Sequence, residues 1–299
     1  MTAASATAER HHAAPDAEFA FGRDDFERMR ALIHRRAGIH LHAGKQAMVY
    51  SRLSRRLREL GHRSFGTYLQ ALERAHGEAA EVEWQEFVNC LTTNLTSFFR
   101  EPHHFALLEA ALRQRRGMPT RLWCNAASTG EEPYSIAMTV SEALGAQPPV
   151  TILATDIDTR VLDTAARGVY AASARGLTPE RLKRHFLRGS GSNAGLARVK
   201  PELRALLEFR VHNLMDERWA LGDGFDIVFC RNVMIYFDAP TQRRVLERLH
   251  RAMRPQGLLF AGHSENFADA SRTAFRWLSA EERSASLKAS SAYSVSNSS

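Results

Sequence analysis

Apolar residues in the first third of the chain recur every three or four positions, which is the spacing of amphipathic helices. The clearest example is 45–60, where one face is apolar and the opposite face carries arginines. Asp24 and Asp25 favour the start of an earlier helix, and Gly38 favours its stop. Four helices are expected, over residues 24–36, 45–60, 64–74 and 81–95.

Beyond residue 120 the pattern changes to short apolar runs that alternate with helical stretches. Strands are expected over residues 121–124, 151–155, 207–211, 225–230 and 257–261, with a last one over 292–295. Helices are expected over residues 135–144, 160–167 and 241–253. Such alternation predicts a doubly wound parallel α/β sheet, in which ligands lie beyond the carboxyl ends of the strands.

Residues 170–205 interrupt this alternation with a glycine- and serine-rich turn at 189–195 and a strand-like run at 196–199. We interpret them as an inserted hairpin or small β-subdomain, with a disordered loop as the alternative. The expected division of the chain is a disordered tail (1–19), a helical domain (20–75), a helical linker (76–96), the domain of the large sheet (97–290) and a C-terminal strand and tail (291–299).

The distribution of charge adds a feature that periodicity does not show. The 299 residues are 44% hydrophobic and 24% charged, an ordinary globular composition, and they are enough for more than one domain. The formal net charge is +7, and residues 21–63 account for all of it, with eleven Lys/Arg against four Asp/Glu. This concentration suggests an acidic macromolecular partner for the helical domain.

The cysteines and the N-terminus bear on location. Cys90, Cys124 and Cys230 lie far apart in apolar runs, which indicates buried thiols and a cytoplasmic protein. The alanine-rich N-terminus lacks the apolar segment of a signal peptide, and no apolar run approaches the ~20 residues that cross a bilayer. We therefore expect no direct membrane insertion.

The most informative segment is 121–135, where a short strand turns through small residues into a helix. Small residues and Gly130 allow a ligand to approach the backbone closely. Glu131 and Glu132 follow at once, and their carboxylates would repel a phosphate at the start of the helix. The turn favours a ligand with positive charge and hydroxyls, such as S-adenosylmethionine with its sulfonium, ammonium and ribose.

An acidic residue ends the next expected strand. Asp156 is suited to accept hydrogen bonds from ribose hydroxyls, because an ionised carboxylate is only an acceptor. The alternative is that Asp156 or Asp158 merely caps the following helix. Asp158 suits the cap better, which leaves Asp156 for the ligand.

Two further strands end in polar residues. Arg231 and Asn232 follow the buried run 225–230, and Tyr236 offers an aromatic wall with a polar tip. A core strand that ends in a surface ion pair is the alternative. Asn213 follows 207–211 in the same way and suits an adenine edge, although asparagine is also an ordinary turn residue.

Other candidate chemistry is weaker. Residues 92–100 fit a helix end with aromatic core residues, and 262–265 fits a turn as well as a nucleophilic triad. We assign no metal, because the adjacent His103 and His104 are poorly placed to ligate one ion together. No Walker motif and no Gly-x-Ser-x-Gly motif occurs.

Several segments together resemble one family, the chemotaxis receptor glutamate methyltransferases, often called CheR. They are Arg36-Ala37-Gly38-Ile39, 91–101 (LTTNLTSFFRE), 126–136 (AASTGEEPYSI), 155–158, 230–238 (CRNVMIYFD) and 258–267 (LLFAGHSENF). The resemblance implies a Rossmann-like class I methyltransferase sheet, a small all-helical domain before it and an inserted β-subdomain. It implies S-adenosyl-L-methionine held by Asn94, Thr96, Arg100, Glu132, Asp156, Asn213, Leu214, Asn232 and Val233.

Members of this family methylate glutamates on the cytoplasmic helices of transmembrane chemoreceptors, and in some the β-subdomain also binds a peptide at the receptor's C-terminus. Our hypothesis for the reaction is that Arg100 and Tyr236 orient the acceptor carboxylate. The receptor helices are expected to meet the basic face formed by Lys45, Arg52, Arg55 and Arg56.

Two other functions remain as alternatives. A nucleic-acid methyltransferase would fit the isoelectric point of about 9.7, but the basic charge is confined to one segment and we expect no nucleic-acid partner. A non-enzymatic adaptor that senses S-adenosylmethionine would need the same cofactor residues without methyl transfer.

Overall fold

A computed structural model of the 299-residue chain describes residues 18–222, 224–263, 265, 275–277 and 292–295. Two compact units divide the chain, Met1–Leu91 and Thr92–Ser299. Residues 1–17 of the expected tail and most of 278–299 lie outside the described residues.

The first unit is helical. Its helices are α1 (Arg23–Ala37), α2 (Gln46–Leu60), α3 (Phe65–Arg74) and α4 (Glu78–Leu91), with a short 3-10 turn η1 (Ala43–Lys45) before α2. Gly38 ends α1 in the left-handed conformation at φ 71°, and the Ser64 hydroxyl caps α3 by accepting from the backbone N–H of Thr67. Apolar side chains at the predicted spacing meet inside, and each large one that is fully buried contributes about 1.5–3 kcal/mol.

The four predicted helices are confirmed, but the end of the fourth is wrong. Helix α4 ends at Leu91 and not at residue 95. The next residues are held outside a helix by the second unit's own contacts: the Thr92 hydroxyl donates to Asp158 at 2.6 Å, and the Asn94 amide donates to the same carboxylate at 2.8 Å. Helix propensity depends on the local sequence, so it does not reflect a hydrogen-bond partner more than sixty residues away.

The second unit is built on a seven-stranded sheet in the order β6-β2-β1-β7-β8-β10-β9. Its strands are β1 (Thr120–Asn125), β2 (Val150–Asp156), β6 (Leu207–Val211), β7 (Phe225–Cys230), β8 (Met253–Ala261), β9 (Phe275–Trp277) and β10 (Ala292–Val295). The pairs from β6 to β8 are parallel, and β10 runs antiparallel to both of its neighbours. The predicted doubly wound sheet is therefore confirmed.

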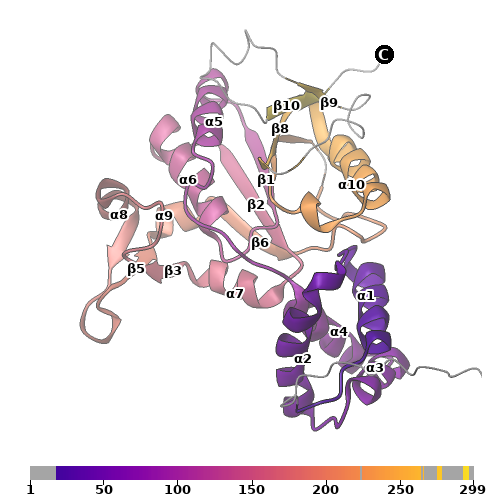
Figure 1. Cartoon of the computed structure of the whole chain (residues 1–299). Helices are drawn as coiled ribbons and strands as arrows, with labels where there is room; N and C mark the ends of the chain where they lie inside the picture. The colour runs from indigo at the N-terminus through magenta and orange to yellow at the C-terminus, as the bar shows by residue number, and fades with distance from the viewer. Residues whose placement is uncertain (1–17, 223, 264, 266–274, 278–291, 296–299) are drawn as a thin grey trace, which may run out of the picture. The chain divides into compact units, whose positions relative to one another are not determined.

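Helices cover both faces of this sheet (Figure 1). Alternate residues of β1 separate two cores: Leu122 and Cys124 pack with α5 and α6, whereas Trp123 packs with α10. Helix α7 packs against β2 and β6. These helices are α5 (His103–Gln114), α6 (Glu131–Leu144), α7 (Thr159–Arg167) and α10 (Ala239–Ala252).

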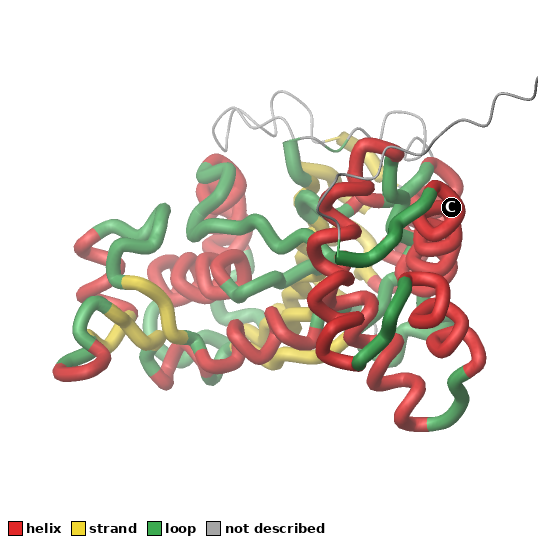
Figure 2. The backbone as a smooth tube through the Cα atoms, turned by 60° about the horizontal axis from the view of Figure 1, so that its bottom comes forward, coloured by secondary structure: helices red, strands yellow, loops and turns green. Residues whose placement is uncertain are grey.

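The interruption at 170–205 is a small antiparallel sheet with the order β3-β5-β4, which lies apart from the large sheet in both views (Figures 1 and 2). This confirms the inserted β-subdomain over the disordered-loop alternative. Its elements are β3 (Val169–Ala171), α8 (Pro179–His185), β4 (Phe186–Arg188), the 3-10 turn η2 (Gly191–Asn193) and β5 (Leu196–Val199), with α9 (Pro201–Arg204) after them.

The inserted β-subdomain is tied to the loop that follows α4. The Phe98 ring meets Tyr170 at 5.0 Å and Phe186 at 6.0 Å between centroids, both edge to face. A Cβ added at Gly176 would lie 1.9 Å from the carbonyl oxygen of Phe98. Only glycine fits there, since its φ is +90° as well.

Two cysteine predictions are confirmed and one is wrong. Cys124 and Cys230 are buried free thiols, whereas Cys90 is half-buried on α4. Among the residues that the structure describes, every helix is too short or too polar to cross a membrane.

Candidate active site

The candidate site lies where the parallel strands end. Five segments follow the carboxyl ends of β1, β2, β6, β7 and β8, and hydrogen bonds join the loop 92–101 to those after β1, β2, β7 and β8. Together these segments carry more acids than bases, which gives the edge a negative balance. The acids are Glu101, Glu131, Glu132, Asp156, Asp158, Asp216, Glu217, Asp238 and Glu265, and the arginines that accompany them are Arg100, Arg218 and Arg231.

The turn after β1 approaches its neighbours closely. Ala126 and Ser128 have positive φ values of 53° and 51°, which are rare for residues with a Cβ. A Cβ at Gly130 would lie 2.5 Å from the Tyr170 hydroxyl and 2.8 Å from the Ala165 methyl. Small residues are therefore needed in this turn for two reasons, the close packing of its neighbours and the positive φ values.

Asp156 is buried at the end of β2, with 8% of its surface exposed. Its carboxylate accepts from the backbone N–H of Ser128 at 2.8 Å and of Asp158 at 2.9 Å. Burial raises its pKa to about 6, although these N–H donors oppose the rise. Asp158 caps α7 by accepting from Arg160 and Val161, so the predicted division of roles between cap and strand-end carboxylate is confirmed for Asp158.

The acidic pair at the start of α6 is split. Glu132 is buried and its Oε2 accepts from Arg231 at 2.6 Å, while the Cys124 thiol donates to its Oε1 at 3.4 Å. Burial raises the pKa of Glu132, and Arg231 opposes this. Glu131 is half-buried and accepts from the Thr129 hydroxyl at 2.6 Å. The predicted contact of Glu132 with the cofactor stays a prediction, with its carboxylate engaged by Arg231.

Sequence reasoning missed the partner of Arg231. Its side chain is fully buried; besides Glu132 it lies 3.6 Å from Glu101 and donates to the carbonyl oxygen of Arg100. A buried arginine at the end of an apolar strand requires an acidic partner, and this was the available signal. The surface ion pair considered from the sequence is wrong, because the pair is internal.

The loop 92–101 brings three predicted residues to the edge. The guanidinium of Arg100 donates to the carbonyl oxygen of Leu95 at 2.9 Å. The Asn94 amide donates to Asp158, and the Asn94 carbonyl accepts from the Ser128 hydroxyl at 3.1 Å. Thr96 lies half-buried between them in the chain. The structure thus joins this loop to the turns after β1 and β2.

The turn after β7 carries Asn232, Val233 and Tyr236. Asn232 has a φ of 58°, and its amide lies 3.5 Å from a carboxylate oxygen of Glu101. Val233 and Tyr236 are half-buried against the core on the α10 side of the sheet. The predicted position of these residues beyond a strand end is confirmed; their roles stay predictions.

The segment after β6 carries two predicted cofactor residues, and neither is exposed. Asn213 accepts from the backbone N–H of Met215 at 2.9 Å, as a turn asparagine does, and Leu214 is buried in the core on the α10 side. Both lie beyond the carboxyl end of β6, as the topology predicted.

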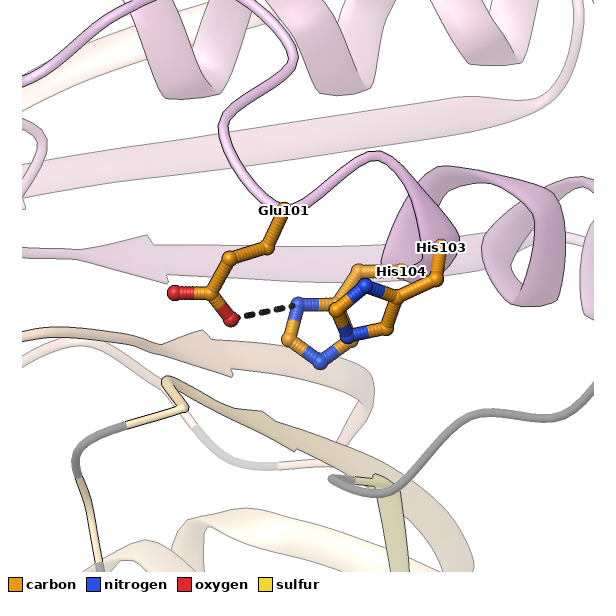
Figure 3. Close-up of side chains that lie close together, drawn as sticks. All are labelled: Glu101, His103 and His104. Atoms are coloured by element: carbon orange, nitrogen blue, oxygen red, sulfur yellow. Dashed lines mark ion pairs between the residues drawn. The ribbon is translucent and has the colours of Figure 1, made fainter.

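Glu101, His103 and His104 form a cluster of possible metal ligands (Figure 3). Glu101 lies 3.6 Å from Nδ1 of His104, but the same carboxylate lies 3.6 Å from Arg231 and accepts from the backbone N–H of His263. A guanidinium at that distance already gives the carboxylate a cation and would repel a metal ion. We therefore assign no metal to this cluster.

The predicted receptor-binding residues lie in the first unit and differ in their surroundings. The Arg55 side chain is 80% exposed and pairs with Glu59, whereas Arg56 is 17% exposed and bridges to Glu83 of α4. Arg52 reaches the carbonyl oxygen of Cys90 at 3.4 Å. Lys45 ends η1 and is half-buried. Arg56 therefore holds α2 to α4, while Arg55 presents its charge to solvent.

The sheet reverses its strand order at β1 and β7, and a bound nucleotide lies at such a switch point. A negative edge suits the sulfonium and ammonium of S-adenosylmethionine, and a buried strand-end carboxylate suits its ribose. Fold and site together define an S-adenosylmethionine-dependent methyltransferase.

The chain belongs to the CheR methyltransferase family. Residues 24–92 match the family's all-alpha domain, and residues 94–283 match its SAM binding domain. S-adenosylmethionine is accordingly the cofactor of this chain. This confirms the resemblance drawn from the motifs.

Curated relatives cover most of the chain. It is 56% identical over 258 residues to "Chemotaxis protein methyltransferase 2" of Pseudomonas aeruginosa, covering 85% of this chain and 90% of that protein. It is 53% identical to "Chemotaxis protein methyltransferase" of Klebsiella aerogenes, covering 83% and 84%. The protein of the same name from Escherichia coli is 51% identical, covering 83% and 86%. These relatives support S-adenosylmethionine-dependent methylation in chemotaxis.

Proposed function

We propose that this protein transfers a methyl group from S-adenosylmethionine to glutamate side chains on the cytoplasmic helices of chemoreceptors, which forms methyl esters. The observation that carries the proposal is the negative edge of the sheet, with the buried Asp156 at its second strand, in a chain whose relatives are chemotaxis methyltransferases. The site of action is the cytoplasm.

The cofactor is held by residues from five segments. Asp156 accepts from the ribose hydroxyls, and its backbone donors fix the direction of the carboxylate. The acidic residues at the start of α6 face the positively charged groups of the cofactor. The remaining contacts come from Asn94, Thr96, Arg100, Glu132, Asn213, Leu214, Asn232 and Val233.

Bound S-adenosylmethionine supplies a methyl group activated by a sulfonium. A glutamate side chain with its ordinary pKa of about 4.3 is ionised at neutral pH, so the protein needs no general base to activate it. The task of the protein is to orient the acceptor and exclude water, because charge is lost as the methyl moves. Arg100 and Tyr236 orient the acceptor carboxylate.

The basic face of α2 aligns the receptor. Chemoreceptor methylation regions are acidic helices, and complementary charge speeds and orients such encounters. The exposure of Arg55 supports a direct contact, and Lys45 and Arg52 extend the face. The inserted β-subdomain offers the edge strands β3 and β4, to which an extended receptor tail can add as a strand.

One assay tests the proposal. The full-length protein is incubated with tritiated S-adenosylmethionine and receptor-containing membranes, and base-labile methyl ester is measured on protein. Arg100→Ala and Tyr236→Phe are expected to lower turnover. Label in nucleic acid would select a nucleic-acid methyltransferase, and bound cofactor without label in any acceptor would select the sensing adaptor.

A further inference from the structure

The turn after β7 contains a residue in the left-handed conformation. Asn232 adopts a φ of 58°, a region that asparagine enters more readily than other residues with a Cβ but still seldom occupies. Such a conformation persists only where contacts with the surrounding residues stabilise it. Neither the family profile nor the relatives explain what holds it.

Glu265, which follows β8, provides that constraint. Its carboxylate is buried, and one oxygen accepts from the backbone N–H groups of Val233 at 2.8 Å and Met234 at 2.9 Å. The other accepts from the N–H of Gly262, and the N–H of Asn232 also donates to the carboxylate. Consecutive N–H groups directed at one anion form a rigid backbone nest.

Gly262 completes the arrangement. A Cβ there would lie 2.6 Å from the side-chain amide nitrogen of Asn232 and 3.0 Å from a carboxylate oxygen of Glu265. The ends of β7 and β8 therefore approach as closely as they do because residue 262 is glycine. The nest is built from both strand ends.

Four backbone donors occupy the oxygens of Glu265, and this excludes the triad role that the sequence 262–265 suggested. The acid of such a triad needs an oxygen that can accept a hydrogen bond from the histidine. The groups that Glu265 orients belong to Asn232 and Val233, to which we have given cofactor contacts.

We infer that Glu265 is a positioning residue, which holds the turn after β7 in the conformation that binds S-adenosylmethionine. The inference rests on the proposed contacts of Asn232 and Val233. It predicts that disturbing Glu265 weakens the cofactor complex more than it weakens the fold.

A matched control exists at the other end of β7. Asp226 is also a buried carboxylate, and it accepts from the backbone N–H of Arg121 at 2.9 Å and from Arg115 at 2.6 Å. It lies at the amino end of the strand, away from the proposed site. Asp226→Asn therefore reports the general effect of disturbing a buried carboxylate on this strand.

The experiment compares full-length Glu265→Gln and Asp226→Asn by calorimetric titration with S-adenosylmethionine and by thermal unfolding. For Glu265→Gln we expect about ten-fold weaker binding and a matching rise in KM for the cofactor, as for one or two lost hydrogen bonds. For Asp226→Asn we expect a lowered Tm with a Kd within about two-fold of the wild type.

Gly262→Ala disturbs the same turn from the opposite side and decides the question if Glu265→Gln fails to fold. Cofactor binding within about two-fold of the wild type in the folded variants at 262 and 265 would overturn the inference, as would equal weakening by Asp226→Asn. Wild-type protein that binds the cofactor but does not methylate receptors would refute the proposed acceptor, and the Kd comparison would still judge Glu265.

Discussion

In the described part of the helical unit, arginines such as Arg28 and Arg55 pair with glutamates at the surface, whereas at the carboxyl edge of the sheet Arg231 and Glu132 pair inside the protein. Surface pairs are screened by salt and each contributes about 0–1 kcal/mol. Breaking a buried pair leaves an uncompensated charge and costs about 3–5 kcal/mol. The surface pairs can therefore break at little cost, while the buried pair fixes the geometry of the strand ends.

The largest expected effect comes from breaking the buried pair. Arg231→Met leaves Glu132 and Glu101 without their shared cation, so the free energy of unfolding should fall by about 3–5 kcal/mol. Chemical denaturation measures this. Arg58→Met, which removes the exposed pair with Glu18, should lower the free energy of unfolding far less, because water and salt already screen that pair. Equal losses in the two variants would contradict the distinction between the two regions.

Loss of the strand-end carboxylate should act on binding. Asp156→Ala removes an acceptor for ribose hydroxyls, and we expect S-adenosylmethionine to bind about ten- to hundred-fold more weakly, since bonds to charged groups contribute about 1.5–3 kcal/mol. Isothermal titration calorimetry measures the change. Asp163→Ala on the exposed face of α7 is the control and should bind normally. An unchanged Kd in Asp156→Ala would remove Asp156 from the cofactor site.

The same carboxylate predicts a pH dependence. The folded pKa of Asp156 is about 6, above its ordinary value, because burial penalises the ionised carboxylate. Its contribution to stability is therefore present at low pH and is lost as pH rises through about 6. Binding needs the ionised form, so the affinity should fall by up to about ten-fold for each pH unit below about 6. Calorimetric titrations with S-adenosylmethionine that give the same Kd at every pH between about 5 and 8 would contradict this.

The smallest expected effect lies on the surface of α2. Arg55→Glu should slow receptor methylation several-fold at low ionic strength, and added salt should reduce the difference, because exposed charges act through a screened field. Initial rates of methyl-ester formation measure it. Arg113→Glu is a matched control, since Arg113 forms the same kind of exposed pair with Glu109 on α5. Equal rates in both variants at low salt would exclude steering by Arg55.

Local pattern was sufficient for most of the large sheet and most of the helices, because both periodicities lie within short windows of sequence, but α5 and β9 were not predicted. The strands β6 and β7 begin and end where the sequence predicted. The end of α4 and the pairing of Arg231 were missed for one reason: their partners, Asp158 and Glu132, are 64 to 99 residues away in the chain. The nest at Glu265 was missed because a carboxylate that binds backbone N–H groups leaves no signature in side-chain spacing.

The packing of Phe98 against the inserted β-subdomain has a consequence for protein engineering. Phe98 lies between Tyr170 and Phe186, Gly176 leaves room for its carbonyl, and the Tyr170 hydroxyl donates to the carbonyl oxygen of Thr129. The subdomain is therefore not a detachable cassette. A chimaera that exchanges the subdomain between relatives must transfer these contacts together. Otherwise an aromatic ring will be exposed beside the turn after β1.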